Sequence, residues 1–233
     1  MKFFICTYTN KVKSYCDEGF FKNLAAIANG NPVMVVDNTH DSGEYAARIK
    51  KLIPTACVER IKCPSGPHLF LRNVAESANK CREGFLASGC DHMLIIESDV
   101  FPPADLLERL EEDMAFLRKR KQVTLTRQEA MSKPNQWGII GAIYYPGYHD
   151  FNVYGILAVT GERTALSGCT LYNGELIKKV AFRWDVNLTA AFPDAFMSHD
   201  SSKLGFTNWN DHDIRCHHAE KGPNDRGHSE LLS

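Results

Sequence analysis

The stretch HMLIIESDVFPPADLLERL, residues 92–110, is the most informative part of this sequence. Its apolar run ends abruptly at Glu97, Ser98 and Asp99, and Phe-Pro-Pro then leads into apolar residues at helical spacing. This order predicts a buried strand followed by a helix, with two carboxylates at the carboxyl end of the strand. Open α/β sheets bind their ligands at that edge. Two acids there suit a hard divalent cation, although a solvated acidic turn would have the same pattern.

The rest of the chain alternates between strand-like and helix-like segments. Strands are expected at residues 2–9, 32–36, 56–61, 93–96, 137–145 and 154–159, and helices at residues 20–28, 43–52 and 73–87. Ser42 is the expected N-cap of the second helix. Alternation at this spacing is typical of βαβ units, so we expect an α/β fold in which helices flank a mainly parallel sheet.

The composition is that of an ordinary globular protein. The 233 residues carry a formal net charge of −1, which gives no electrostatic reason to expect binding to nucleic acid or an anionic membrane. No apolar run is long enough to span a bilayer, and the run in residues 1–9 is too short for a signal peptide. The eight cysteines therefore indicate reduced thiols in a cytoplasmic protein. Residues 219–233 are expected to form a flexible tail.

Four segments together resemble the motifs of the GT-A-fold glycosyltransferases, close to the family-2-type group. They follow that family's order: VVDNTHDSG at 35–43, LRNVAESANKCREGF at 71–85, IIESDVFPPADLLERL at 95–110 and PDAFMSHDSSKLGF at 193–206. The resemblance implies one GT-A-like, Rossmann-like domain over residues 1–218, with a nucleotide- and metal-binding half at 1–117 and an acceptor half at 136–218. It also implies transfer of a sugar from a nucleotide diphosphate sugar to an acceptor hydroxyl.

The same resemblance implies a metal site. Glu97 and Asp99 stand at the positions of the family's DxD acids, which bind Mn²⁺ or Mg²⁺ together with the donor diphosphate. Glu97 is longer than the usual aspartate by one methylene, so Asp99 is the expected direct ligand and Glu97 is expected to act through water. The metal would act as a Lewis acid on the charge that develops on the leaving diphosphate.

Five residues are expected to bind the donor. Asp37 matches the aspartate with which the family contacts the nucleotide base or ribose. Thr7 and Tyr8 end the first expected strand, where the family wraps around the nucleotide, but they would also suit simple strand packing. Arg72 is placed to reach the phosphates or to cap its helix, and Ser98 lies between the two acids.

Asp194 is the expected catalytic residue. An acceptor hydroxyl needs a general base, and the resemblance assigns this role to Asp194, which precedes Gly205 by eleven residues as in the family's pattern. A base opposite the leaving group implies in-line, inverting transfer. The alternative is that Asp194 only accepts hydrogen bonds at the start of its helix. The motif's arginine is replaced near Asp200, and retaining families share the fold, so the stereochemistry stays open.

His218 is the expected third metal ligand, because the family places a histidine after this helix. The neighbouring His217 is the competing candidate. In a strand, Ile214, Cys216 and His218 share one face, and the apolar pair should point inward, which favours His218. Imidazole accepts Mn²⁺ more readily than Mg²⁺, so a preference for Mn²⁺ is expected.

Two other classes of enzyme stay open. A nucleotidyltransferase uses a similar nucleotide-binding platform, but it usually has a glycine-rich loop where this chain has residues 7–11. A metal-dependent nuclease would use His199 and Asp200 or the His217-His218 pair, without the usual spacing for such a site. The acceptor also stays open between a polysaccharide, a lipid-linked saccharide, a protein and a modified nucleic-acid base, for which the basic loop at residues 118–127 gives weak support.

Overall fold

An eight-stranded sheet organises the part of the chain that the computed structural model describes, which comprises residues 1–63, 69–119, 137–145, 168–187 and 192–219. Its strand order is β3-β2-β1-β4-β7-β6-β8-β5. The strands are β1 (Phe3–Thr9), β2 (Val33–Asp37), β3 (Cys57–Arg60), β4 (His92–Ile96), β5 (Val100–Phe101), β6 (Trp137–Tyr145), β7 (Cys169–Asn173) and β8 (Thr207–His218).

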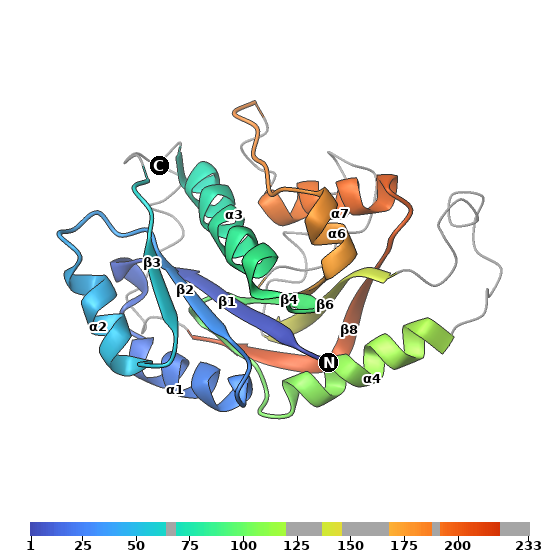
Figure 1. Cartoon of the computed structure of the whole chain (residues 1–233), viewed down its shortest axis with the longest axis horizontal. Coiled ribbons are helices and arrows are strands. Elements are labelled where there is room, and N and C mark those ends of the chain that lie inside the picture. Colours follow the sequence, from blue (N-terminus) through green and yellow to red (C-terminus); the bar gives the residue numbers. More distant parts are fainter. Residues whose placement is uncertain (64–68, 120–136, 146–167, 188–191, 220–233) are drawn as a thin grey trace.

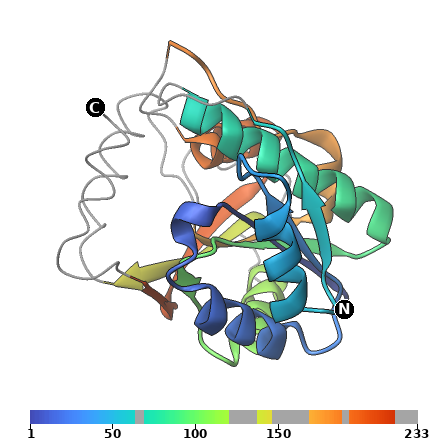
Figure 2. The ribbon, with the colours of Figure 1, turned by 90° about the vertical axis from the view of Figure 1, so that its left-hand side faces the viewer.

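Helices cover both faces of this sheet. They are η1 (Lys11–Lys13), α1 (Asp17–Ala28), α2 (Glu44–Leu52), α3 (Phe70–Ser88), α4 (Leu106–Lys119), α6 (Gly174–Lys179) and α7 (Pro193–Lys203). In Figure 1, α3, α6 and α7 lie above the sheet, and α1, α2 and α4 lie below it. Figure 2 shows the same layers from the side, with α3 on one side of the sheet and α1 on the other.

The expected α/β architecture is confirmed. Strands β3, β2, β1 and β4 are parallel to one another, as βαβ units require. The second half of the sheet is mixed, because β7 is antiparallel to β4 and β6, whereas β6 and β8 are parallel. The strand expected at 154–159 and nearly all of the tail expected at 219–233 lie outside the described residues.

Alternating side chains of the central strands feed two hydrophobic cores. On β1, Phe3 and Ile5 belong to the core beneath the sheet, whereas Phe4 and Cys6 belong to the core on the α3 side. Successive side chains of a strand point to opposite faces, so a strand covered on both faces is apolar throughout. This explains why the apolar runs in the sequence are continuous. The polar residues that end these runs lie at the ends of the strands.

One expected helix cap is wrong. Ser42 Oγ donates to Glu44 Oε1 at 3.2 Å and does not cap α2. Asp41 provides the cap, since its two carboxylate oxygens accept from Gly43 N at 2.7 Å and Tyr45 N at 3.0 Å. Gly43 has a φ of 106°, a conformation that costs glycine little and lets Asp41 reach both amides.

None of the helices in the described segments is long and apolar enough to cross a membrane.

Candidate active site

The carboxyl ends of β2, β1 and β4 lie side by side and bring several expected site residues to one edge of the sheet. Asp37 is the last residue of β2, Thr7 and Tyr8 lie close to the carboxyl end of β1, and Glu97 follows β4 directly. The parallel pairing of β1 with both neighbours holds these strand ends in register. This edge is where a doubly covered parallel sheet can bind a nucleotide.

A tight turn carries the two acids from β4 into β5. Val100 N donates to Glu97 O at 3.0 Å, which closes the turn. The turn is also held on both sides, because Glu97 N donates to Gly168 O and Ala219 N donates to Asp99 O, each at 2.7 Å. Since the chain reverses within this turn, Glu97 and Asp99 enter different surroundings although only Ser98 separates them.

Asp99 lies between a lysine and a histidine. Lys13 Nζ is 2.8 Å from Asp99 Oδ1, and His218 Nε2 is 3.7 Å from Asp99 Oδ2. The antiparallel pairing of Val100 with His218 brings this imidazole to the turn. His217 points elsewhere, and its ring centroid lies 6.2 Å from that of Phe101. The alternation expected along β8 is therefore seen, and His218 is the imidazole beside Asp99.

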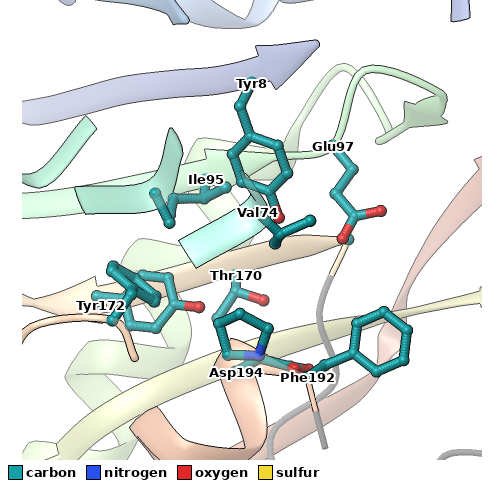
Figure 3. A pocket seen from close by; sticks show the side chains of 12 residues that line it. Tyr8, Val74, Ile95, Glu97, Thr170, Tyr172, Phe192 and Asp194 are labelled. Atoms are coloured by element: carbon teal, nitrogen blue, oxygen red, sulfur yellow. The ribbon is translucent and has the colours of Figure 1, made fainter. Parts of the chain in front are cut away.

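Glu97 lines a cavity on the α3 side of the sheet. The cavity has room for roughly two water molecules and is lined by residues from β1, β4, β7, α3 and α7, among them Tyr8, Thr170 and Asp194. Figure 3 shows Glu97 and Asp194 on opposite sides of this cavity. Burial raises the pKa of Glu97 to about 7, Lys13 opposes this rise, and the negative charges of Asp99 and Asp194 add to it.

Asp194 lies in the first turn of α7, where Pro193 occupies the start of the helix. Proline favours this position because its fixed φ suits a helix and its missing N–H is not needed there. Asp194 thus lines the cavity from the first turn of α7. Asp200, six residues later on α7, is engaged elsewhere, since Arg183 Nε and Nη2 donate to its two oxygens at 2.8 and 2.9 Å. This bidentate pair lowers the pKa of Asp200.

Asp37 forms the opposite end of the site. It is fully buried, and its Oδ1 accepts from Thr39 N at 2.8 Å. Its Oδ2 makes no hydrogen bond within the described residues and lies 3.6 Å from Arg60 Nε. Arg60 also pairs with Asp41 at 2.9 Å. A buried carboxylate oxygen without a hydrogen bond is ready to accept one from a ligand.

The remaining expected donor-binding residues differ in their placement. Thr7 and Ser98 are buried, and the hydroxyl of each makes no hydrogen bond within the part of the chain that the structure describes. Tyr8 lines the cavity. Arg72 instead pairs with Glu76 along α3, with Nε 2.6 Å from Oε1. Tyr8 is thus at the cavity and Ser98 lies between the two acids, whereas Thr7 points to the same face of β1 as Phe3 and Ile5, beneath the sheet, and the guanidinium of Arg72 is held on the helix surface.

Two basic residues at the site were missed from the sequence. Lys13 contacts Asp99 from η1, and Arg60 contacts Asp37 from the end of β3. Neither belongs to a recognisable motif, and both reach acids that are distant in the sequence. The only available signal was that each lies at or just beyond the carboxyl end of an expected parallel strand.

The ligand atoms that Asp99 and its neighbour His218 offer are partly suited to a divalent metal ion. A carboxylate oxygen and an imidazole nitrogen 3.7 Å apart are ligand types that Mn²⁺ accepts, and His218 is held in place by β5–β8 pairing. However, no three His, Cys, Asp or Glu side chains converge closely enough to hold a metal ion among the described residues. The expected trio of Glu97, Asp99 and His218 is therefore not drawn together, because the turn directs Glu97 into the cavity.

Comparisons with known proteins give structural but not sequence relatives. No family model matches the chain, and no curated protein matches it significantly. Among solved structures, the chain is similar to the mannosyltransferase PcManGT from Pyrobaculum calidifontis in complex with GDP-Man and Mn²⁺, with a TM-score of 0.62 and 14% identity over 96% of this chain and 58% of that one. It is also similar to S. aureus TarS, with a TM-score of 0.59 and 13% identity over 100% of this chain and 38% of that one.

A third similar structure is glucosyl-3-phosphoglycerate synthase from Mycobacterium tuberculosis in complex with Mn²⁺, UDP-glucose and phosphoglyceric acid. Its TM-score is 0.55 at 14% identity, over 96% of this chain and 73% of that one. The chain spans less than two thirds of the length of PcManGT and of TarS. At such low identity these likenesses establish the fold, which is the GT-A fold of nucleotide-sugar glycosyltransferases.

Proposed function

We propose that this protein is a metal-dependent glycosyltransferase that moves a sugar from a nucleotide diphosphate sugar to an acceptor hydroxyl. The observation that carries the proposal is the order of groups along one edge of a GT-A sheet. Buried Asp37 lies at one end, Asp99 with His218 lies at the other, and a cavity lined by Glu97 and Asp194 lies on the α3 side. Each group suits one part of such a donor or its reaction.

The nucleoside would bind at the ends of β2 and β1. Asp37 Oδ2 is a buried polar atom that makes no hydrogen bond to any described residue, and a base or ribose is proposed to donate one to it, with Thr7 near the end of the adjacent strand β1. Tyr8 and Ser98 would border the diphosphate. Tyr8 lies near the end of β1 and Ser98 lies in the turn after β4, and both strand ends are on the edge of the sheet that runs from Asp37 to Asp99. Arg72 stays a proposed donor ligand only if its side chain leaves Glu76.

Asp99 and His218 are the proposed direct ligands of Mn²⁺ or Mg²⁺, and Glu97 is proposed to act through a bridging water. When bound, such an ion supplies Lewis-acid stabilisation of the charge that develops on the leaving diphosphate. Imidazole ligation favours Mn²⁺ over Mg²⁺. The complexes of PcManGT with GDP-Man and Mn²⁺ and of the M. tuberculosis synthase with Mn²⁺ and UDP-glucose support this choice of metal and donor class.

Asp194 is the proposed general base of an inverting transfer. Two observations support it: Asp194 lines the cavity, and Asp200, the nearest alternative on α7, is bound by Arg183. Asp194 would accept the proton of the acceptor hydroxyl as that oxygen attacks the sugar. Glu97 is the competing base, because it lines the same cavity and its pKa is raised to about 7.

Product analysis of a donor screen tests the proposal. UDP-, GDP- and TDP-sugars would be incubated with the protein and Mn²⁺, and the released nucleotide would be identified. Release of a nucleoside diphosphate supports a glycosyltransferase, whereas release of pyrophosphate would identify a nucleotidyltransferase instead. The proposed acceptor is a hydroxyl of a polysaccharide, a lipid-linked saccharide, a protein or a modified nucleic-acid base, in the cytoplasm.

A further inference from the structure

Lys13 is an unexpected cation at the turn that carries Glu97 and Asp99, which we call the acid turn. Its Nζ lies 2.8 Å from Asp99 Oδ1, and the two residues are 86 positions apart in the sequence. Asp99 is only 5% exposed. A carboxylate this buried is costly unless a positive charge or several hydrogen bonds compensate it, and here the ammonium of Lys13 does so.

The position of Lys13 is fixed by its own turn. Asn10 Oδ1 accepts from Val12 N at 2.9 Å, and Lys13 N donates to Asn10 O at 3.0 Å, which together form η1. The thiol of Cys16 then joins this turn to the acid turn, because its Sγ lies 3.1 Å from both Lys13 O and Ser98 O. The lysine is therefore held beside Asp99 by the backbone and is not simply a surface side chain that reaches it.

The electrostatic setting keeps Lys13 charged. Its Nζ lies 2.8 Å from Asp99 Oδ1, and a lysine ammonium paired with a carboxylate is protonated at neutral pH. Lys13 is thus a permanent cation at the place where a divalent ion would also have to bind. On the other side of the carboxylate, His218 Nε2 is 3.7 Å from Asp99 Oδ2.

A divalent ion bound to Asp99 would lie close to the Lys13 ammonium, and the two positive charges would repel each other. We propose that Lys13 and the divalent metal ion are alternative partners of Asp99, and that Lys13, once displaced, binds the diphosphate of the nucleotide donor. This inference rests on the proposed function. The ammonium suits the second role because it is a compact charge with three donors on a flexible stem, so a small rotation carries it from one anion to the next.

The first experiment measures Mn²⁺ binding to the donor-free protein by electron paramagnetic resonance. Lys13→Gln removes the competing charge but keeps a hydrogen-bond donor beside Asp99, which limits the loss of stability. We expect this variant to bind Mn²⁺ about tenfold more tightly, because the ion no longer has to displace the Lys13 ammonium from Asp99. A factor of about ten is modest for the attraction between two unit charges near a protein surface. Lys13→Arg should bind Mn²⁺ as the wild type does. Lys11→Gln is the matched control, since Lys11 is an exposed lysine of the same turn.

The second experiment measures the affinity for UDP and GDP in the presence of Mn²⁺. Lys13→Gln should lower the affinity for whichever of UDP and GDP binds more tightly by about tenfold, because the variant loses a charged hydrogen bond to phosphate. Lys11→Gln should leave this affinity unchanged. Opposite changes in metal and nucleotide affinity are the signature of the proposal. A residue that only stabilised the fold would weaken both.

A third measurement uses the wild-type protein and so does not depend on the folding of a variant. Acetylation by acetic anhydride, followed by mass spectrometry, should modify Lys13 faster when Mn²⁺ is present without nucleotide, while Lys11 serves as the internal reference. Unchanged Mn²⁺ affinity in Lys13→Gln, or unchanged acetylation of Lys13, would overturn the inference while leaving the transferase proposal intact. If neither the wild type nor Lys13→Gln binds Mn²⁺, the inference and the metal site are both overturned, and the donor screen still tests sugar transfer.

Discussion

Asp99→Asn is the most direct perturbation of the proposed metal site. The substitution keeps the shape of the side chain but removes the charge that faces Lys13 and His218. If the metal contributes about 3 kcal/mol of transition-state stabilisation through this carboxylate, transfer should fall by roughly a hundredfold or more. Mn²⁺ should also no longer increase the affinity for the nucleotide donor.

The fold should survive this change. The Lys13 side chain is 30% exposed, so solvent screens the ion pair and its loss should cost about 1 kcal/mol or less. In a domain of this size that corresponds to a fall in Tm of roughly 2–4 °C. The assay therefore pairs initial rates of nucleoside diphosphate release with a thermal melt.

Asp105→Asn is the matched control, since Asp105 forms an exposed ion pair with Arg109 at 2.8 Å. It should change neither donor affinity nor rate. The reasoning would be refuted if Asp99→Asn transferred sugar at nearly the wild-type rate, or if the wild type bound its donor equally well with and without Mn²⁺.

Three other substitutions test separate parts of the site and fold. Asp194→Asn should bind donor normally and transfer about a hundredfold more slowly; a rate near wild type would leave Glu97 as the base. His218→Ala should weaken Mn²⁺ binding by at least about tenfold, and the reverse result, with only His217→Ala affected, would move the ligand by one residue. Burial, followed by repulsion from Asp211, raises the pKa of Asp113 to about 7, so the wild type loses stability as the pH rises from the unfolded-state pKa near 4 towards 7. Asp113→Asn cannot ionise, and its advantage in Tm over the wild type should therefore widen between about pH 4 and pH 7, by roughly 2–4 °C after discounting for partial exposure; a constant difference across this range would contradict the assignment.

The order and type of most secondary-structure elements could be predicted from the sequence. Apolar periodicity is a local property, so the strands around residues 3–9, 33–37 and 92–96 and the helix after residue 70 were recognisable without tertiary information. The alternation along β8 is equally local, and it distinguished His218 from His217 before their surroundings were known. The GT-A fold followed from motif order for the same reason, because each motif marks the end of a strand or the start of a helix.

Tertiary structure alone decided which partners these residues meet. The contact of Lys13 with Asp99 and that of Arg60 with Asp37 join segments that only the sheet order brings together. The divergence of Glu97 from Asp99 depends on a turn that is held from outside by Gly168 and Ala219. Strand and helix periodicity is fixed by neighbouring residues in the chain, whereas the charge balance of a buried site is fixed by whatever residues the fold packs against it, and spacing in the sequence carries no record of that.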